Sequence, residues 1–171
     1  MERGRNSISF KHKLFFSPIF ISVLLLDQVT KKLIIKSMLY GDSKMVIGNV
    51  VKFTYIRNPN SVFGLNFGGA VVSTTLTIIA FIFVLFLFWK SDSKFSLTSL
   101  SFIIGGALGN LTDRFLYMEV IDFIDVGVGN WRWPTFNVAD SFVTIGLILL
   151  IIYFVLIESS YKKSINNERT L

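Results

Sequence analysis

Four long apolar stretches alternate with shorter polar segments along the chain. The clearest covers residues 70–89, which contain no charged residue. At about 1.5 Å per residue, a helix of that length spans about 30 Å, the thickness of the hydrocarbon core of a bilayer. The other three stretches lie at about 14–39, 95–116 and 138–157. This pattern predicts an all-α membrane protein with four transmembrane helices.

The first apolar stretch follows a basic tail and carries two charged residues in its second half. A basic tail before an apolar run is also typical of a cleaved signal peptide, but no small-x-small cleavage site follows it. We therefore interpret the stretch as an uncleaved first helix. Asp27 and Lys31 share one face of this helix because they are four residues apart. They form a self-neutralising pair that eases insertion, one wall of a polar site, or both, and the sequence favours neither reading over the other.

The segments between the helices contain signals for extended structure and for the membrane surface. Val51, Phe53 and Tyr55 alternate with more polar residues, which predicts a short strand. Trp131 and Trp133 are typical of anchors at a membrane interface. We expect a single polytopic membrane domain over residues 1–171, with a small extracytoplasmic β-containing loop region formed by loops at about 41–69 and 117–136.

The composition agrees with a membrane protein and argues against a nucleic-acid-binding protein. Hydrophobic residues make up 52% of the 171 residues and charged residues only 16%, and the mean hydropathy is +0.61. The net charge is +6, but much of the positive charge lies in tails beside the apolar stretches rather than on one basic face. We therefore expect membrane lipid around the chain and no nucleic-acid partner.

The basic residues also predict an orientation. Four helices place both tails on one side of the membrane, together with the turn between the second and third helices. That side carries nine of the 17 Lys and Arg residues, so the count alone gives only a small bias. The small excess of Lys and Arg lies in the exposed tails and in the turn, so we place both termini in the cytoplasm and the loops outside.

Carboxylates are the main candidates for chemistry. The chain has no Cys and one His, His12 in the basic tail, so disulfides, a thiolate nucleophile, a zinc site and any other metal or cofactor are not expected. A charged residue at the centre of a membrane helix costs roughly 2.5–3.5 kcal/mol, so acids beside apolar stretches suggest a function. Two close carboxylates that share a proton hydrolyse amides, because one accepts a proton from water and the other donates one.

Spacing alone does not choose among the four candidate acids, Asp113, Asp122, Asp125 and Asp140. Asp122 and Asp140 stand at the two ends of the second loop, and we interpret them as an aspartyl protease dyad at a membrane surface. Asp140 is also a candidate helix cap, because Asn137 three residues earlier begins a pattern close to a capping box. A Ser141 nucleophile with Lys31 as its base is disfavoured, since nothing in the sequence places Lys31 nearby.

Two other functions remain open from the residues alone. Acids such as Asp27, Asp122 and Asp140 also bind cations or relay protons in small transporters and channels. Acids at loop–helix junctions on one predicted side favour a surface site over a path through the membrane. A purely structural membrane subunit would leave the acids unexplained.

Five short blocks stand in order along the chain. They are 27–31 (DQVTK), 57–58 (RN), 105–114 (GGALGNLTDR), 120–124 (VIDFI) and 136–141 (FNVADS). Each block alone is modest evidence, but all five in this order with four membrane helices are highly specific. Over about residues 14–157 the chain resembles the lipoprotein signal peptidase family, bacterial signal peptidase II.

The resemblance implies an aspartic endopeptidase that removes the signal peptide from diacylglyceryl-modified prolipoproteins and cuts before the lipidated Cys. It implies a metal-free site near the extracytoplasmic face of the bacterial inner membrane, and inhibition by globomycin-type cyclic peptides. Residue by residue, it implies a catalytic dyad of Asp122 and Asp140, substrate-binding positions at Asn58, Asn110, Arg114 and Asn137, and supporting positions at Asp27, Lys31 and Asp113.

One block departs from the family pattern. The family usually has Gly where this chain has Asn60, in the loop that follows Asn58. Asn tolerates the left-handed backbone region better than most residues, so we expect Asn60 to keep a turn with positive φ.

The position of Asp140 at a helix start suggests how the dyad shares its proton. The helix N-terminus favours a negative charge. We therefore expect Asp140 to hold the charge, and Asp122 the shared proton, before substrate binds.

Overall fold

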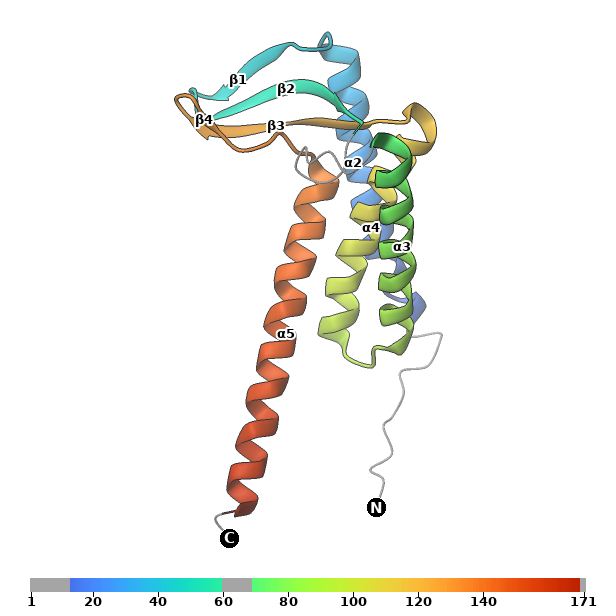
Figure 1. Cartoon of the computed structure of the whole chain (residues 1–171), viewed down its shortest axis with the longest axis vertical. Helices are drawn as coiled ribbons and strands as arrows, with labels where there is room; N and C mark the ends of the chain where they lie inside the picture. Colours follow the sequence, from blue (N-terminus) through green and yellow to red (C-terminus); the bar gives the residue numbers. More distant parts are fainter. Residues whose placement is uncertain (1–12, 60–68, 170–171) are drawn as a thin grey trace.

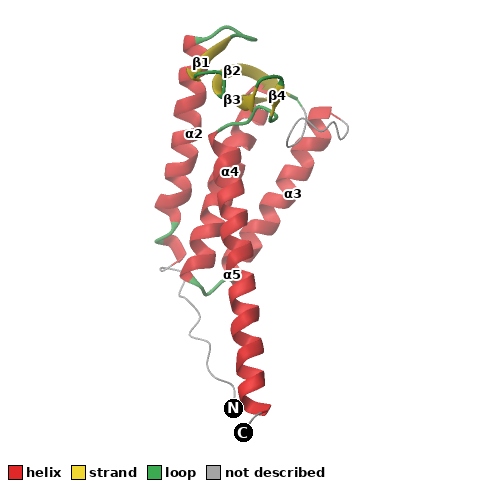
Figure 2. Cartoon of the chain, turned by 90° about the vertical axis from the view of Figure 1, so that its left-hand side faces the viewer, coloured by secondary structure: helices red, strands yellow, loops and turns green. Residues whose placement is uncertain are grey.

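The computed structural model describes residues 13–59 and 69–169, which form a helical bundle with a small β-sheet across one end (Figure 1). The helices are α2 (Ser17–Ser37), α3 (Gly69–Lys90), α4 (Lys94–Tyr117) and α5 (Val138–Arg169). The strands are β1 (Ser43–Ile47), β2 (Val51–Asn58), β3 (Val120–Val128) and β4 (Trp131–Arg132). Figure 2 shows the sheet lying across the upper ends of the helices, while the start of α2 and the end of α5 point the other way.

Among the described residues, three helices are long and apolar enough to cross a membrane. They are Gly69–Lys90, Lys94–Tyr117 and Val138–Ile157, and they correspond to the second, third and fourth predicted helices. The fourth candidate, α2, is 21 residues long but carries Asp27 and several lysines. Length and composition therefore support three of the four predicted transmembrane helices.

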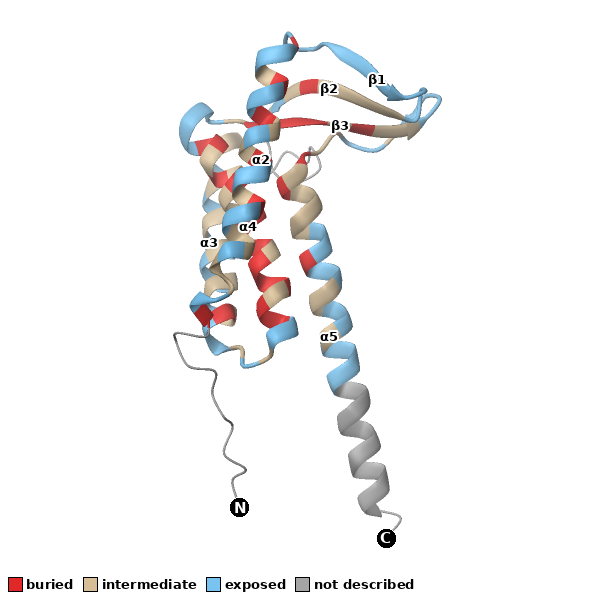
Figure 3. Ribbon diagram, turned by 180° about the vertical axis from the view of Figure 1, so that it is seen from behind, coloured by how far each residue is buried: buried red, intermediate tan, exposed pale blue. Residues whose placement is uncertain are grey.

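The bundle has an apolar core, but it also buries charged side chains and exposes many large apolar ones. Helix α4 packs against α2, α3 and α5 and holds most of the buried helical residues (Figure 3). On α2, Asp27 and Lys31 are buried, whereas Leu25 and Leu33 are 58% and 59% exposed. This distribution is the reverse of that in a water-soluble bundle, and it fits helices surrounded by lipid.

Glycines allow α4 to pack closely against its neighbours. A Cβ added to Gly106 would lie 2.4 Å from the carbonyl oxygen of Ala139, at the start of α5. A Cβ added to Gly109 would lie 2.5 Å from Asp27 Oδ2 on α2. The small-residue pattern that the sequence shows here therefore brings three helices together at one level of the bundle.

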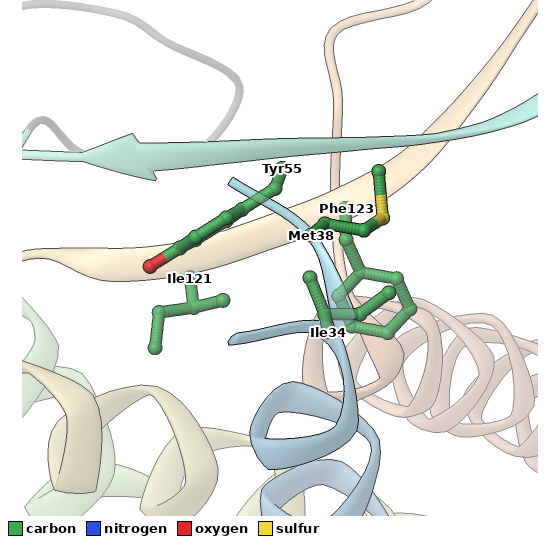
Figure 4. Close-up of a cluster of buried hydrophobic side chains, with 5 residues drawn as sticks. All are labelled: Ile34, Met38, Tyr55, Ile121 and Phe123. Carbon is green, nitrogen blue, oxygen red and sulfur yellow. The ribbon is translucent and has the colours of Figure 1, made fainter. Parts of the chain in front are cut away.

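An apolar cluster attaches the antiparallel sheet, whose strand order is β1-β2-β3-β4, to the bundle. Ile34 of α2 and Met38, which follows this helix, pack against Tyr55 of β2 and against Ile121 and Phe123 of β3 (Figure 4). Burial of these side chains holds β3 directly above the ends of α2 and α4.

Two segments differ from their predicted structure. The strand predicted around Val51 is present as β2, but the segment predicted as the second loop contains β3 and β4. The first four residues of β3 are all buried, so apolar and polar residues do not alternate in the way that identifies a half-exposed strand. Helix α5 continues to Arg169 rather than ending near 157, because no Gly or Pro interrupts the polar residues that follow.

Candidate active site

Asp122 and Asp140 lie in different elements, and both are hydrogen-bonded to the same asparagine. Asp122 lies in β3, and Asp140 lies in the first turn of α5. The side-chain Nδ2 of Asn137 donates a hydrogen bond to Asp122 Oδ1 over 2.7 Å. The backbone N–H of the same residue donates to Asp140 Oδ2 over 3.2 Å. One residue therefore holds the two carboxyl groups next to each other.

Two further asparagines bind the remaining carboxyl oxygens. Asn58 Nδ2 donates to Asp122 Oδ2 over 3.0 Å, and Asn110 Nδ2 donates to Asp140 Oδ1 over 2.8 Å. Each of the four oxygens accepts a hydrogen bond from an uncharged amide group. These bonds fix the orientation of both carboxyl groups without placing a cation directly on either one.

The burial of Asp122 changes its acidity. Asp122 is only 2% exposed to solvent. Burial first, and the charge of Asp140 second, raise the pKa of Asp122 from 3.8 to about 7, while hydrogen bonds from Asn58 and Asn137 and the cation of Lys31 oppose the rise. Near neutral pH the pair therefore has a group that can hold a proton next to one that can accept it.

The first turn of α5 is capped by the same residues. Asn137 Oδ1 accepts a hydrogen bond from the backbone N–H of Asp140 over 2.9 Å, and Asp140 Oδ2 accepts one from the backbone N–H of Asn137. This reciprocal pair is the arrangement of a capping box. The cap that the sequence suggested is present, and it uses only one of the two oxygens of Asp140.

The paired aspartates line one end of a cleft between α3, α4 and α5, with a volume of about 380 Å³. Asn58, Asn110 and Arg114 line the same polar end. The walls that continue along the helices are mostly apolar. They include Leu76, Phe81, Val84, Ile103, Ala107, Val143 and Leu147.

Comparison with known proteins decides the family. Residues 19–156 match the family model described as signal peptidase (SPase) II. The chain belongs to the signal peptidase II family. Membership of a protease family disfavours the transporter and the structural subunit, because neither cleaves a peptide bond.

Individual members of the signal peptidase II family are similar to this chain over most of their length. The lipoprotein signal peptidase of Staphylococcus haemolyticus (strain JCSC1435) is 40% identical over 135 residues, which cover 77% of this chain and 85% of that protein. That of Staphylococcus aureus (strain Newman) is 40% identical over 146 residues, covering 84% and 88%. A solved structure described as a bacterial membrane enzyme at 2.3 Å resolution is 35% identical, with a TM-score of 0.78 over 90% of this chain and 93% of the other. The chain is a signal peptidase II protease and a multi-pass membrane protein.

Behind the paired aspartates, this signal peptidase II chain contains a buried ion cluster. Lys31 Nζ lies 2.8 Å from Asp27 Oδ2 and 2.7 Å from Asp113 Oδ2. Asp27 Oδ1 also accepts a hydrogen bond from the backbone N–H of Ala139, and Asp113 Oδ2 accepts one from that of Ile121. The Asp27–Lys31 pair is therefore neutralising and also part of the polar surroundings of Asp122 and Asp140.

The other candidate groups have different contacts. Asp125 binds Arg132 and accepts a hydrogen bond from Thr54 over 2.9 Å, so it joins strands of the sheet and does not line the cleft. Ser141 Oγ donates to the carbonyl oxygen of Asn137 over 3.0 Å. The structure brings Asp122 and Asp140 together and gives Asp113 and Asp125 contacts elsewhere.

Three features of the site go beyond the sequence prediction, and one predicted position lies outside the described residues. Asn137 is fully buried and does not line the cleft, so it differs from Asn58, Asn110 and Arg114. The sequence predicts no role for Gln28, yet its Nε2 donates a hydrogen bond to Asp113 Oδ1 over 3.0 Å. The only signal for this contact is the position of Gln28 next to Asp27. The apolar walls gave no signal, because they arise from packing between helices. Asn60 lies outside the described residues.

Proposed function

We propose that the chain is an aspartic endopeptidase that removes the signal peptide from diacylglyceryl-modified prolipoproteins and cuts just before the lipidated Cys. The observation that carries the proposal is the pairing of Asp122 and Asp140 on Asn137 at the polar end of an apolar cleft. The relatives named lipoprotein signal peptidase support the substrate class. A cleft with carboxyl groups at one end and apolar walls beyond suits a peptide bond that lies beside lipid chains.

In the proposed reaction Asp140 acts as the base and Asp122 as the acid. Asp140 lies at the N-terminus of α5, where the helix dipole stabilises its charge, and Asp122 holds a proton because its pKa is about 7. Asp140 takes a proton from water while the water oxygen attacks the scissile carbonyl carbon, and Asp122 protonates the carbonyl oxygen. Asp140 then donates its proton to the leaving amine nitrogen while Asp122 takes one back from a hydroxyl of the tetrahedral intermediate, so the C–N bond breaks, the new carboxyl group forms and the singly protonated pair is restored. No metal or cofactor takes part.

The polar residues around the dyad divide into two groups in this proposal. Asn58, Asn110 and Arg114 line the cleft, so they contact the substrate. Asn137 is buried behind the dyad and orients it instead. Asp27, Lys31 and Asp113 support the elements that carry Asp122 and Asp140.

We further propose that four helices of a single domain, residues 1–171, cross the bacterial inner membrane. Helix α2 is the fourth span, because its Asp27 and Lys31 face inward while Leu25 and Leu33 face outward. The sheet, with exposed tryptophans at 131 and 133, then lies at the outer surface, and both termini lie in the cytoplasm. The dyad is near the extracytoplasmic face, where prolipoproteins and globomycin-type inhibitors enter the cleft from the lipid.

Three single substitutions test the dyad. Asp122→Asn and Asp140→Asn should each lower cleavage of a diacylglyceryl prolipoprotein peptide by at least ~1000-fold, because an amide cannot exchange the proton. Asp125→Asn is the matched control in the same strand, and we expect it to keep most of the activity. The rates are measured on detergent-solubilised protein and expressed per folded molecule.

Two outcomes would contradict the assignment. One is turnover by Asp140→Asn at a fair fraction of the parent rate, which would leave Asp140 only its role as a helix cap. The other is an inactive Asp125→Asn together with an active Asp122→Asn, which would show that the wrong acid of β3 was chosen.

A further inference from the structure

Lys31 is a buried cation that makes one contact beyond its ion pairs. It is 1% exposed and does not line the cleft. Its Nζ binds Asp27 and Asp113, and it also donates a hydrogen bond to Asn110 Oδ1 over 3.0 Å. An ammonium group has three N–H donors, so these three acceptors use all of them. Of the three partners, only Asn110 has a side chain that itself binds a carboxyl group of the dyad.

The contact with Lys31 is one of two donor contacts that determine which way the amide of Asn110 points. The oxygen and nitrogen of an Asn amide have nearly the same shape, so the hydrogen-bond partners decide its orientation. Lys31 can only donate, which holds Asn110 Oδ1 toward Lys31 and leaves Nδ2 facing Asp140 at 2.8 Å. A reversed amide would place Oδ1 against the carboxylate of Asp140, and two acceptors would then face each other.

The same amide oxygen is connected to the other carboxyl group. Asn110 Oδ1 also accepts a hydrogen bond from Asn137 Nδ2 over 3.1 Å, and this nitrogen donates to Asp122 Oδ1. A continuous set of hydrogen bonds therefore runs from Lys31 through Asn110 to Asp140, and through Asn137 to Asp122.

We propose that Lys31 is a positioning residue for the peptidase reaction, which keeps the Asn110 amide turned so that its N–H group holds Asp140 in the orientation required of the base. This inference rests on the proposed function. It assigns Lys31 an effect on the rate of the chemical step, exerted through Asn110 and without contact with substrate.

A purely structural role is the alternative, and simple removal of Lys31 cannot exclude it. Asp27 and Asp113 hold the backbone N–H groups of Ala139 and Ile121, and both would become buried acids without a cation. Such buried acids without a cation destabilise the fold and would lower activity through misfolding. The charged groups that interact with Lys31 are Asp27 on α2, Asp113 on α4, Asp122 on β3 and Asp140 on α5.

Neutralising the two acids first separates the two roles. In an Asp27→Asn/Asp113→Asn double variant, the new amide oxygens still accept from Ala139 and Ile121, and Lys31 still donates to Asn110. Adding Lys31→Met gives a triple variant that has lost the donor to Asn110 together with any hydrogen bond from Lys31 that remains to residues 27 and 113. It leaves no unpaired charge in the cluster, so the triple variant should melt no lower than the double variant.

The measurements are kcat, KM and melting temperature on a diacylglyceryl prolipoprotein peptide in detergent. We expect kcat of the triple variant to be at least tenfold below that of the double variant, with KM within threefold. In an Asn110→Ala background, the same Lys31→Met step should change kcat less than threefold, because the residue through which Lys31 acts is gone.

The outcomes separate this inference from the proposed function. Equal kcat values for the double and triple variants would overturn the role of Lys31 while leaving the dyad intact. A double variant without turnover would assign the effect to the two acids and would also overturn it. A parent protein that does not cleave the peptide would overturn both proposals.

Discussion

At the scale of single residues, uncharged amide groups control the two carboxyl groups. Each oxygen of Asp122 and Asp140 accepts from an amide N–H, and the cation of Lys31 stays one hydrogen bond away, behind Asn110. A direct ion pair would favour the ionised form of both acids. Amide donors fix the geometry and still allow one acid to keep its proton.

Both carboxyl oxygens of Asp140 accept hydrogen bonds, and this changes the stability that we expect for Asp140→Asn. If Asp140 acted only as a helix cap, its replacement by Asn would lower the stability of the protein by about 1 kcal/mol at most. Since both oxygens accept, an amide satisfies only one donor and turns its own N–H groups toward the other. The variant should lose about 1–3 kcal/mol of stability, which is why its activity is compared per folded molecule.

The raised pKa of Asp122 predicts a loss of activity at alkaline pH. In the proposed mechanism its acid form protonates the scissile carbonyl, and it loses this proton as the pH rises through about 7. We expect kcat/KM to fall by about tenfold per pH unit above that value. A rate that stays constant from pH 7 to pH 9 would show that Asp122 is not the acid.

The same group predicts the pH dependence of stability. The Asp122 carboxyl ionises near 3.8 in the unfolded chain and near 7 in the folded one, so the folded chain binds the extra proton between these values. Its contribution is therefore fully present below about pH 3.8 and is lost as the pH rises to about 7. Melting temperatures should show this slope in the parent and a smaller slope in Asp122→Asn.

Chelation tests whether any metal takes part. The chain has one His and no Cys, and within the described part of the chain no group of three His, Cys, Asp or Glu could hold an ion. We expect cleavage to continue at an unchanged rate after dialysis against EDTA. Activity that disappears on chelation and returns with a divalent ion would contradict the aspartyl mechanism.

At the scale of elements, the position of α5 against α4 sets the position of Asp140. Gly106 lets the carbonyl oxygen of Ala139 approach α4, and Gly109 leaves room for Asp27, which binds the N–H of Ala139. The start of α5 is therefore located by backbone contacts next to the residue that carries the carboxyl group. Small shifts of this turn would move Asp140 relative to Asp122.

Gly106→Ala tests this dependence, with Gly146→Ala as the control at the same helix interface. Both added methyl groups would meet backbone oxygens, at 2.4 Å from Ala139 and 2.7 Å from Ser99, so each should cost about 1–3 kcal/mol of stability. Gly146 lies six residues beyond Asp140, about 9 Å along the helix. We expect Gly106→Ala to lower kcat per folded molecule and Gly146→Ala to preserve it; equal activities would show that the turn can shift without effect.

At the scale of the whole molecule, the sheet and the helix ends define two sides. The sheet lies at one end, and the α3–α4 turn lies at the other (Figure 1). Large apolar side chains are exposed along the helices between these ends, for example Ile79 and Ile151 at 59% and 61%. Lipid around the bundle accounts for this exposure, which would be unfavourable in water.

Thiol labelling tests the proposed orientation. Because the chain has no Cys, one introduced Cys is the only reactive thiol. In intact cells a membrane-impermeant maleimide should label Val128→Cys, which replaces a 72% exposed side chain of the sheet, and should not label Ser91→Cys in the α3–α4 turn. The opposite pattern would invert the orientation, and labelling of both at equal rates would contradict the membrane crossing.

Local properties of the chain identify the type of protein and the chemistry open to it. Uncharged runs such as 70–89 require a membrane helix whatever surrounds them, because their length and composition are local properties. The lack of Cys and the single His left carboxylates as the candidates. The alternation around Phe53 predicted β2 for the same reason, since one face of that strand stays partly exposed.

Packing between helices and strands, in contrast, selects which carboxylates meet and what surrounds them. Asp122 and Asp125 are equivalent by spacing, but the sheet directs Asp125 to Arg132 and Asp122 to Asn137. The start of α5 is held by a hydrogen bond from Ala139 to Asp27, 112 residues apart in the chain. Such contacts depend on how helices and strands pack against each other, and no local pattern of residues encodes the cleft that they enclose.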